Sequence, residues 1–171
     1  MARNIEIKAR IGNIAEVTSA ASDIADEGPV ELLQDDTFFH CPAGRLKLRV
    51  FPDGQGELIF YRRANEQGPK ESFYVRSPTS SPETLREALA LAYGISGRVL
   101  KRRTLFLVGR TRIHLDEVHG LGHFVEIEVV LADAEDPDTG ITEARRIMAQ
   151  LAIDDSHLID GAYVDLIAAD G

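Results

Sequence analysis

The stretch NIEIKAR (residues 4–10) alternates between polar and apolar side chains at almost every step. Ile5, Ile7 and Ala9 fall on one parity, and Glu6 and Lys8 fall on the other. Alternation with a period of two is typical of a β-strand that has one buried face. The stretch therefore predicts a strand, and it raises the question whether its charged face meets solvent or a ligand.

Four other stretches repeat this combination of an apolar face and a densely charged face. They are GRLKLRV (44–50), VLKRR (99–103), RTRIHLDE (110–117) and HFVEIEVV (123–130). Exposed strand faces more often mix Thr, Ser, Gln and Lys than they place Arg next to Arg or Glu next to Glu. The charged parity of these stretches holds Arg45, Lys47, Arg49, Lys101, Arg103, Arg110, Arg112, His114, Asp116, Glu126 and Glu128.

Strands dominate the predicted secondary structure. We expect strands at 3–11, 34–41, 44–51, 57–63, 71–76, 98–108, 110–117 and 123–131, and helices at 13–26, 81–93, 139–151 and 157–169. Many consecutive strands without a regular βαβ rhythm predict a mainly β fold of the α+β class, in which an antiparallel sheet or barrel carries peripheral helices. The length of 171 residues favours a single domain over residues 1–171.

Composition narrows the class of protein. The net charge of −9 argues against a general nucleic-acid binder. No apolar run approaches the 18 or so residues of a membrane span. With charged residues from Arg3 onward and Cys41 as the only cysteine, we expect no secretory signal, no internal disulfide and residence in the cytoplasm.

Charge is unevenly distributed along the chain. Residues 45–112 hold 14 Lys and Arg against 6 acids, whereas residues 113–171 hold 2 against 14. Like charges two positions apart on one strand face repel each other unless an opposite charge lies between them. A polyphosphate would relieve the basic pairs, and a divalent cation would relieve the acidic pair. A solvated charged face and a site for a metal-bound triphosphate both remain open on this pattern.

The order of the motifs resembles one known family. The sequence N-x-E-x-K at residue 4, QDDTFF at 34, GRLKLR at 44 and RIHLDEVHGLGHFVEIE at 112–128 resemble the CYTH superfamily of triphosphate tunnel metalloenzymes. That superfamily includes class IV adenylyl cyclases, thiamine triphosphatases and inorganic triphosphatases. The resemblance implies an eight-stranded antiparallel β-barrel, or tunnel, with charged residues inside.

The resemblance also implies roles for individual residues and for small ligands. The implied cofactor is Mg²⁺ or Mn²⁺, and the implied partner is a small triphosphate such as ATP, thiamine triphosphate or tripolyphosphate; a homodimer is a further expectation. The implied metal ligands are Glu6, Asp116, Glu126 and Glu128. The implied catalytic residues are Glu6, Lys8, Glu126 and Glu128. The implied triphosphate-binding residues are Lys8, Arg45, Lys47, Arg49, Lys101, Arg103, Arg110 and Arg112.

Three questions stay open at this level. Asn4 stands where the family has the first acid of E-x-E-x-K, which allows a non-catalytic anion-binding barrel as an alternative to an enzyme. The motifs do not separate hydrolysis of a triphosphate from cyclisation of ATP. The sequence also does not decide which of Arg62, Arg63 and Lys70 faces the tunnel.

Overall fold

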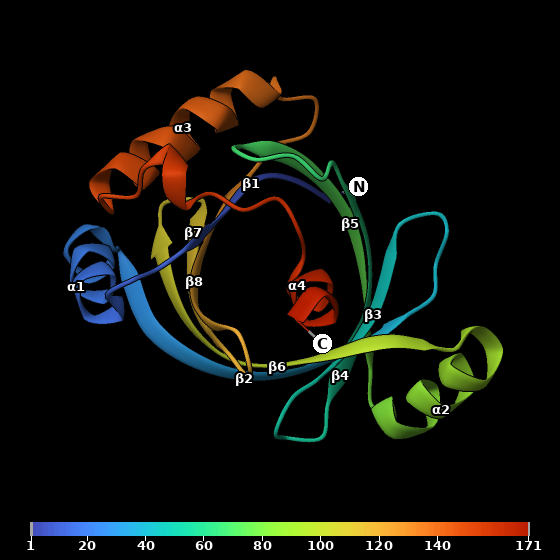
Figure 1. Cartoon of the computed structure of the whole chain (residues 1–171). Helices are drawn as coiled ribbons and strands as arrows, with labels where there is room; N and C mark the ends of the chain where they lie inside the picture. Colours follow the sequence, from blue (N-terminus) through green and yellow to red (C-terminus); the bar gives the residue numbers. More distant parts are fainter. Residues whose placement is uncertain (1, 171) are drawn as a thin grey trace.

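A computed structural model describes residues 2–170 and contains a closed barrel of eight antiparallel strands (Figure 1). The predicted mainly β fold and the eight-stranded barrel are thereby confirmed. The strands are β1 (Ala2–Arg10), β2 (Glu27–Phe39), β3 (Arg45–Val50), β4 (Gly56–Arg63), β5 (Lys70–Thr79), β6 (Ile95–Val108), β7 (Thr111–Val118) and β8 (Gly122–Val130). The helices are α1 (Ile14–Ile24), α2 (Pro82–Tyr93), α3 (Pro137–Gln150) and α4 (Tyr163–Asp170).

Around the barrel the strands follow the order β1-β5-β4-β3-β2-β6-β7-β8, and β1 closes the ring by pairing with both β5 and β8. Consecutive strands pair along β2 to β5 and along β6 to β8, whereas α1 and α2 connect strands that are separated in the ring. The register places Lys8 opposite Glu126 and Asp36 opposite Arg49. Charged residues from distant parts of the sequence thus become cross-strand neighbours.

Local sequence signals explain where the two crossover helices begin and end. The side chain of Asn13 accepts hydrogen bonds from the backbone N–H groups of Ala15 and Glu16, as an N-cap residue does. Pro82 occupies the first turn of α2, where its missing N–H costs nothing. Gly94 ends α2 with a φ of +79°, a conformation that glycine adopts without strain.

The main hydrophobic core lies outside the barrel wall. The outward parity of β1 places Ile5, Ile7 and Ala9 against apolar residues of α1 and α3, and Ile113 and Ile127 join the same cluster. Figure 1 shows α1 and α3 lying against the outer side of the ring. Because the helices cover the apolar face of the strands, the charged parity is left to line the interior.

A second, smaller apolar cluster involves α4. This helix lies within the outline of the ring when the barrel is viewed end-on (Figure 1). Tyr163 and Val164 pack with Phe38, Val99 and Phe124, and all five side chains are buried. The last helix therefore fills part of the barrel interior, whereas α1 and α3 lie against its outer side.

Several predicted boundaries differ from the structure. β2 begins at Glu27 instead of residue 34, and β6 begins at Ile95 instead of residue 98. Both extensions have mostly exposed side chains, so the buried alternation that predicts a strand is weak there. The predicted helix at 157–169 is a 3₁₀ turn at Asp155–His157 followed by an extended segment, and α4 begins only at Tyr163. The extended segment runs along β1, where Ile159 N–H bonds to Lys8 O at 3.0 Å.

No helix within residues 2–170 has both the length and the apolar character required to cross a membrane.

Candidate active site: a charged tunnel

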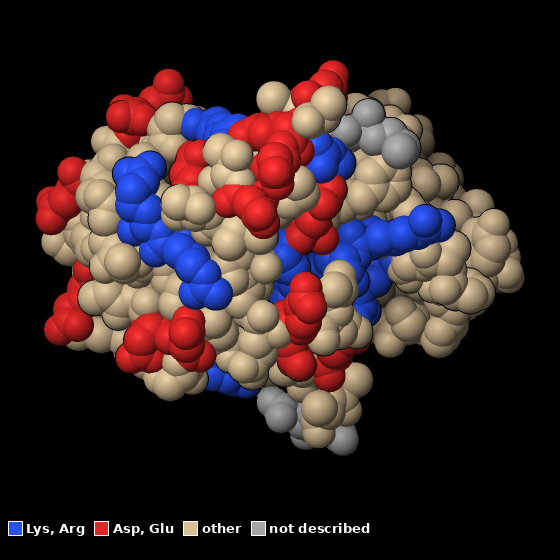
Figure 2. Space-filling view, turned by 90° about the horizontal axis from the view of Figure 1, so that it is seen from above, with Lys and Arg blue, Asp and Glu red and all other residues tan. Residues whose placement is uncertain are grey.

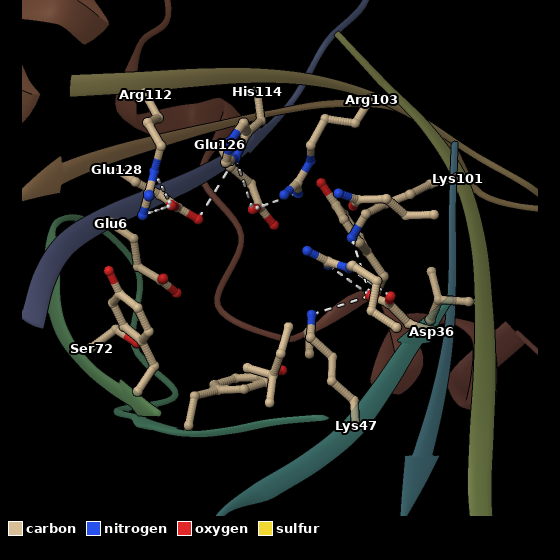
Figure 3. Close-up of a pocket in the computed structure, with 18 of the residues that line it drawn as sticks. Glu6, Asp36, Lys47, Ser72, Lys101, Arg103, Arg112, His114, Glu126 and Glu128 are labelled. Atoms are coloured by element: carbon tan, nitrogen blue, oxygen red, sulfur yellow. Dashed lines mark hydrogen bonds and ion pairs between the residues drawn. The ribbon is translucent and has the colours of Figure 1, made fainter. Parts of the chain in front are cut away.

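The barrel encloses a cavity whose wall includes residues from all eight strands (Figure 3). Its volume of about 340 Å³ is within the range of small-molecule sites, about 300–1,000 Å³. Eight basic and five acidic residues line the cavity, so its wall carries a formal net charge of +3 in a protein of net charge −9. They are Lys8, Lys47, Arg49, Arg63, Arg76, Lys101, Arg103 and Arg112 with Glu6, Asp36, Glu57, Glu126 and Glu128.

The outer surface contrasts with this lining. On the face seen in Figure 2, acidic side chains are spread over the surface, and a group of Lys and Arg side chains near the centre has acidic side chains on both sides. The interior basic residues are therefore a confined positive region in an acidic molecule. Such a region suits a compact anion better than a long polyanion.

A basic cluster gathers around one buried carboxylate on the β2, β3 and β6 side of the cavity. Asp36 is 1% exposed and accepts two hydrogen bonds from Arg49, at 2.8 and 2.9 Å. Lys47 Nζ lies 3.1 Å and Lys101 Nζ 3.5 Å from the same carboxylate. Burial alone would raise the pKa of Asp36, but Arg49, Lys47 and Lys101 hold that pKa well below its usual value. The carboxylate therefore stays ionised and holds three cations close together.

The lysines of this cluster are less basic than lysines in water. Burial, with Arg49 close by, lowers the pKa of Lys47 to about 8. Burial, with Arg103 close by, lowers the pKa of Lys101 well below its usual value. The cluster holds more positive charge than one carboxylate neutralises. An anion that enters the cavity would relieve this repulsion.

An acidic cluster, Glu126 and Glu128 of β8, lies on the other side of the cavity (Figure 3). Glu128 accepts from Arg112 at 2.9 Å, and Glu126 lies 3.2 Å from Lys8 Nζ and 3.0 Å from Arg103. Burial would raise the pKa of Glu126, but Lys8 and Arg103 keep that pKa well below its usual value. Both carboxylates are thus available as anionic ligands at neutral pH.

The acidic cluster fits a divalent cation. Ligand atoms of His114, Glu126 and Glu128 lie within 4.8 Å of one another. His114 is 6% exposed, and its Nδ1 atom has no hydrogen-bond partner. Carboxylate oxygens and imidazole nitrogen are both common ligands of divalent metals. The two predicted metal ligands of β8 are thus brought together, with a histidine beside them.

Asp116, the predicted metal ligand of β7, has a different environment. Its side chain is fully buried, accepts two hydrogen bonds from Arg103 at 2.7 and 2.8 Å, and accepts a third from the Tyr163 hydroxyl at 2.7 Å. It is not among the cavity-lining residues. Asp116 thus supports Arg103 from behind, and we leave it out of the metal site proposed below.

β1 contributes both of its predicted residues to the cavity. Lys8 is 4% exposed, lies beside Glu126 and has the Tyr163 ring 4.0 Å from its Nζ atom. Glu6 is paired with Arg63, which answers the open question about the basic residues near 62–70. Arg63 lines the cavity, Arg62 bonds to the backbone O of Ala43, and Lys70 is turned to the backbone O of Glu66.

Two predicted phosphate-binding residues do not line the cavity. Arg110 follows the β6 strand in a turn and binds Glu135 and Glu143 at the outer side of the barrel, because β7 begins only at Thr111. Arg45 is directed to α4, where it binds Asp165. Lys8, Lys47, Arg49, Lys101, Arg103 and Arg112 do line the cavity.

Several lining residues were not assigned from the sequence. Asp36 shares the parity of Gln34 and Phe38 in the QDDTFF motif, so a strict alternation would have directed it inward. Glu57 and Arg76 form a pair across β4 and β5 at 2.7 Å, in strands whose sequence pattern is mixed. Tyr163 had no sequence signal because α4 enters the barrel only through the tertiary fold.

Comparison with known protein families agrees with the family resemblance seen in the sequence. A model of the CYTH domain matches residues 2–163. No curated protein matches the sequence of this chain.

Many solved structures are similar in fold, among them the three that follow. A protein of Pyrococcus horikoshii has a TM-score of 0.83 and 20% identity, over 95% of this chain and 98% of that chain. A candidate adenylate cyclase from Vibrio parahaemolyticus has a TM-score of 0.77 and 20% identity, over 96% and 97%. A candidate adenylyl cyclase from Hippeastrum, described as having a dominant triphosphatase activity, has a TM-score of 0.67 and 16% identity, over 98% and 96%. At these identities the similarity concerns the fold.

Proposed function

The chain belongs to the CYTH domain family, and from this premise we propose that it is a divalent-metal-dependent triphosphatase. The enzyme would hydrolyse the terminal phosphoryl group of a small triphosphate such as tripolyphosphate, thiamine triphosphate or ATP. The observation that carries the proposal is the placement of a basic cluster and an acidic cluster around one cavity (Figure 3). Cations can bind the phosphate chain while carboxylates bind its metal ion.

The basic residues supply binding and orientation. Arg49 donates two hydrogen bonds to Asp36, and Arg103 donates two to Asp116, so both guanidinium groups need little reorganisation to receive an anion. Arginine and lysine N–H groups match phosphate oxygens and stabilise the charge that develops on them during phosphoryl transfer. Lys8, Lys47 and Lys101 add positive charge from three different strands.

The acidic residues supply the metal site. Glu126 and Glu128, with Glu6 nearby on the paired strand β1, would hold Mg²⁺ or Mn²⁺. Such an ion, when bound, neutralises phosphate charge and lowers the pKa of its water. In hydrolysis a water oxygen forms a bond to the terminal phosphorus, the bond to the bridging oxygen breaks, and the remaining diphosphate carries away that electron pair.

Cyclisation of ATP would use the same residues with a different attacking group. The ribose 3′-hydroxyl would attack the α-phosphorus and release pyrophosphate. Water needs no further binding group, and hydrolysis is therefore the function that this site supports best. The assay below distinguishes the two reactions by their products.

The proposal is tested by incubating the protein with tripolyphosphate, thiamine triphosphate and ATP in the presence of Mg²⁺ or Mn²⁺. Release of phosphate is expected, and cyclic AMP with pyrophosphate would instead identify a cyclase. The Glu126→Gln variant is expected to lose activity by about 10²-fold or more, because one carboxylate of the acidic cluster is removed. Glu117→Gln, an exposed residue of β7, is the matched control and should retain activity. No turnover of any substrate with either metal would overturn the proposal.

A non-catalytic anion-binding barrel is the second candidate, and one observation favours it. Asn4 lines the cavity at 3% exposure, and its amide oxygen has no hydrogen-bond partner, at a position where the family has an acid. If the missing carboxylate inactivates the protein, the wild type should have no turnover, and the Asn4→Glu variant should gain metal-dependent turnover. Substantial wild-type activity that is lost in Glu126→Gln would exclude this candidate.

A further inference from the structure

His114 is a buried cavity residue to which the proposed function gives no role. It is on β7, directly opposite Glu126 on β8, between Arg112 and Asp116 of its own strand. Its Nδ1 atom lies 3.6 Å from Glu128 Oε1 and 3.9 Å from Glu126 Oε2, which is too far for hydrogen bonds. A buried nitrogen without a partner is unfavourable, so a ligand at this point would be favoured.

Glu128 leaves a suitable atom for such a ligand, whereas Glu126 would share its oxygens with Lys8 and Arg103. Glu128 uses Oε2 for both hydrogen bonds from Arg112, while its Oε1 is the atom nearest to His114. Metal–ligand bonds of about 2.0–2.2 Å place two ligand atoms of one cation at most about 4.4 Å apart. The separations of 3.6 and 3.9 Å at His114 are within that limit. The three side chains therefore need little movement to share one ion.

We propose that His114 Nδ1 is a direct ligand of the metal, together with Glu126 and Glu128, and that this nitrogen makes the site selective for a first-row transition dication such as Mn²⁺ over Mg²⁺. Imidazole nitrogen binds transition metals well, whereas Mg²⁺ prefers oxygen ligands. On β7 the histidine takes the place expected of Asp116, which is fully buried and does not line the cavity. With Glu126 and Glu128 it gives the ion three protein ligands.

This inference rests on the proposed function only in using the same metal ion, and its test needs no substrate. The decisive measurement is pulsed electron paramagnetic resonance of the full chain loaded with Mn²⁺ alone. Electron spin echo modulation should show a nitrogen nucleus bound to the ion. Incorporation of ¹⁵N-histidine should change that signal from the ¹⁴N to the ¹⁵N pattern. Mn²⁺ binding without nitrogen modulation, or no Mn²⁺ binding, would overturn the inference.

Two variants assign the signal to one residue. His114→Gln should abolish the nitrogen modulation and weaken Mn²⁺ binding, measured by titration calorimetry, by at least about tenfold. Its affinity for Mg²⁺ should change little. His119→Gln, an exposed histidine after β7, should retain the modulation and the affinity. Persistence of the modulation in a folded His114→Gln protein would contradict the assignment, and the isotope experiment decides the matter if that variant does not fold.

The results also separate this inference from the proposed function. Metal-dependent turnover with an all-oxygen Mn²⁺ site would remove His114 from the ligand set and leave the triphosphatase proposal standing. A nitrogen-coordinated Mn²⁺ site without turnover of any triphosphate would overturn the triphosphatase proposal and leave His114 as a metal ligand.

Discussion

At the scale of single residues, Asp36 shows how an acid can serve a site for an anion. Its carboxylate is in contact with Arg49, Lys47 and Lys101, and without it these three cations would repel one another in a buried setting. The acid lowers the cost of assembling the cations, and the cations remain in excess for a ligand. Asp36 is therefore a positioning residue for the basic cluster.

Substitution of Asp36 is expected to destabilise the fold. Asp36→Asn removes the negative charge that contacts these three cations, and losing one partner of a buried ion pair costs about 3–5 kcal/mol. The free energy of unfolding, from urea denaturation, measures this loss. Asp35→Asn is the matched control, because Asp35 pairs with the exposed Arg98 and should cost less than about 1 kcal/mol. Equal losses in the two variants would refute the positioning role.

Lys47 predicts a pH dependence of anion binding. Its pKa of about 8 means that it is charged below pH 8 and loses its proton above that pH in the free protein. A bound phosphate chain favours the charged form, so binding above pH 8 must take up a proton. The affinity for tripolyphosphate should therefore fall by up to about tenfold per pH unit above 8.

The measurement is titration calorimetry with tripolyphosphate between pH 7 and 9.5, in wild type and in Lys47→Arg. Arginine stays charged over this range, so the variant should show a flatter profile above pH 8 than wild type. Identical slopes in the two proteins would show that Lys47 does not titrate in this range.

At the scale of elements, the apolar outer faces of the strands determine where the helices pack. Gly140 allows α3 to approach β1 closely, since a Cβ atom there would lie 2.7 Å from side-chain carbons of Ile5 and Leu131. The close approach buries Ile147 and Ala144 against the barrel. This packing keeps the apolar parity of β1 out of solvent and so keeps Glu6 and Lys8 inside.

Gly140→Ala tests this packing. Alanine favours a helix by about 1 kcal/mol over glycine, but overpacking at this contact should cost about 1–3 kcal/mol. We expect net destabilisation in thermal unfolding. Thr139→Ala, on the exposed side of the same turn, should change stability by less than about 0.5 kcal/mol. A stabilised Gly140→Ala protein would mean that α3 and β1 can separate without loss.

The C-terminal helix also shows how an element acquires a role from its position. Arg45 binds Asp165 and Asp116 binds Tyr163, so α4 is attached to the barrel on two sides. Tyr163 then becomes part of the cavity wall beside Lys8. Neither contact follows from the sequence pattern of residues 157–169.

At the scale of the whole molecule, the interior excess of positive charge works against folding. Eight cations and five acids line one cavity, and repulsion within the lining lowers the stability of the empty barrel. A triphosphate would balance this charge and bind only the folded state. The protein should therefore be markedly more stable when such an anion is present.

Thermal unfolding with tripolyphosphate and without metal measures this effect. At a concentration of one hundred times the dissociation constant, ligand binding adds about 2.7 kcal/mol, which corresponds to roughly 5–10 °C in Tm for a chain of this size. Sodium chloride at equal ionic strength is the control and should give a much smaller shift. Equal shifts in both salts would indicate general screening in place of a specific site.

Sequence alone determined most of the barrel, because β-strand alternation is a local property of the chain. NIEIKAR, RLKLR and VEIE each define a charged face without reference to other strands, and the ordered motifs identify the family. The strand ends at Glu27 and Ile95 were missed because their exposed residues carry no alternating burial signal.

Only the tertiary structure decided which charges share the cavity and what each one contacts. Register brings Asp36 to Arg49 and His114 to Glu126, and it leaves Arg110 outside and Asp116 behind Arg103. The physical reason is that pairing across a closed ring depends on strands distant in sequence, whereas parity is set within each strand. NIEIKAR thus predicts that Glu6 and Lys8 lie on one face, and closure of the barrel turns that face into the wall of a tunnel.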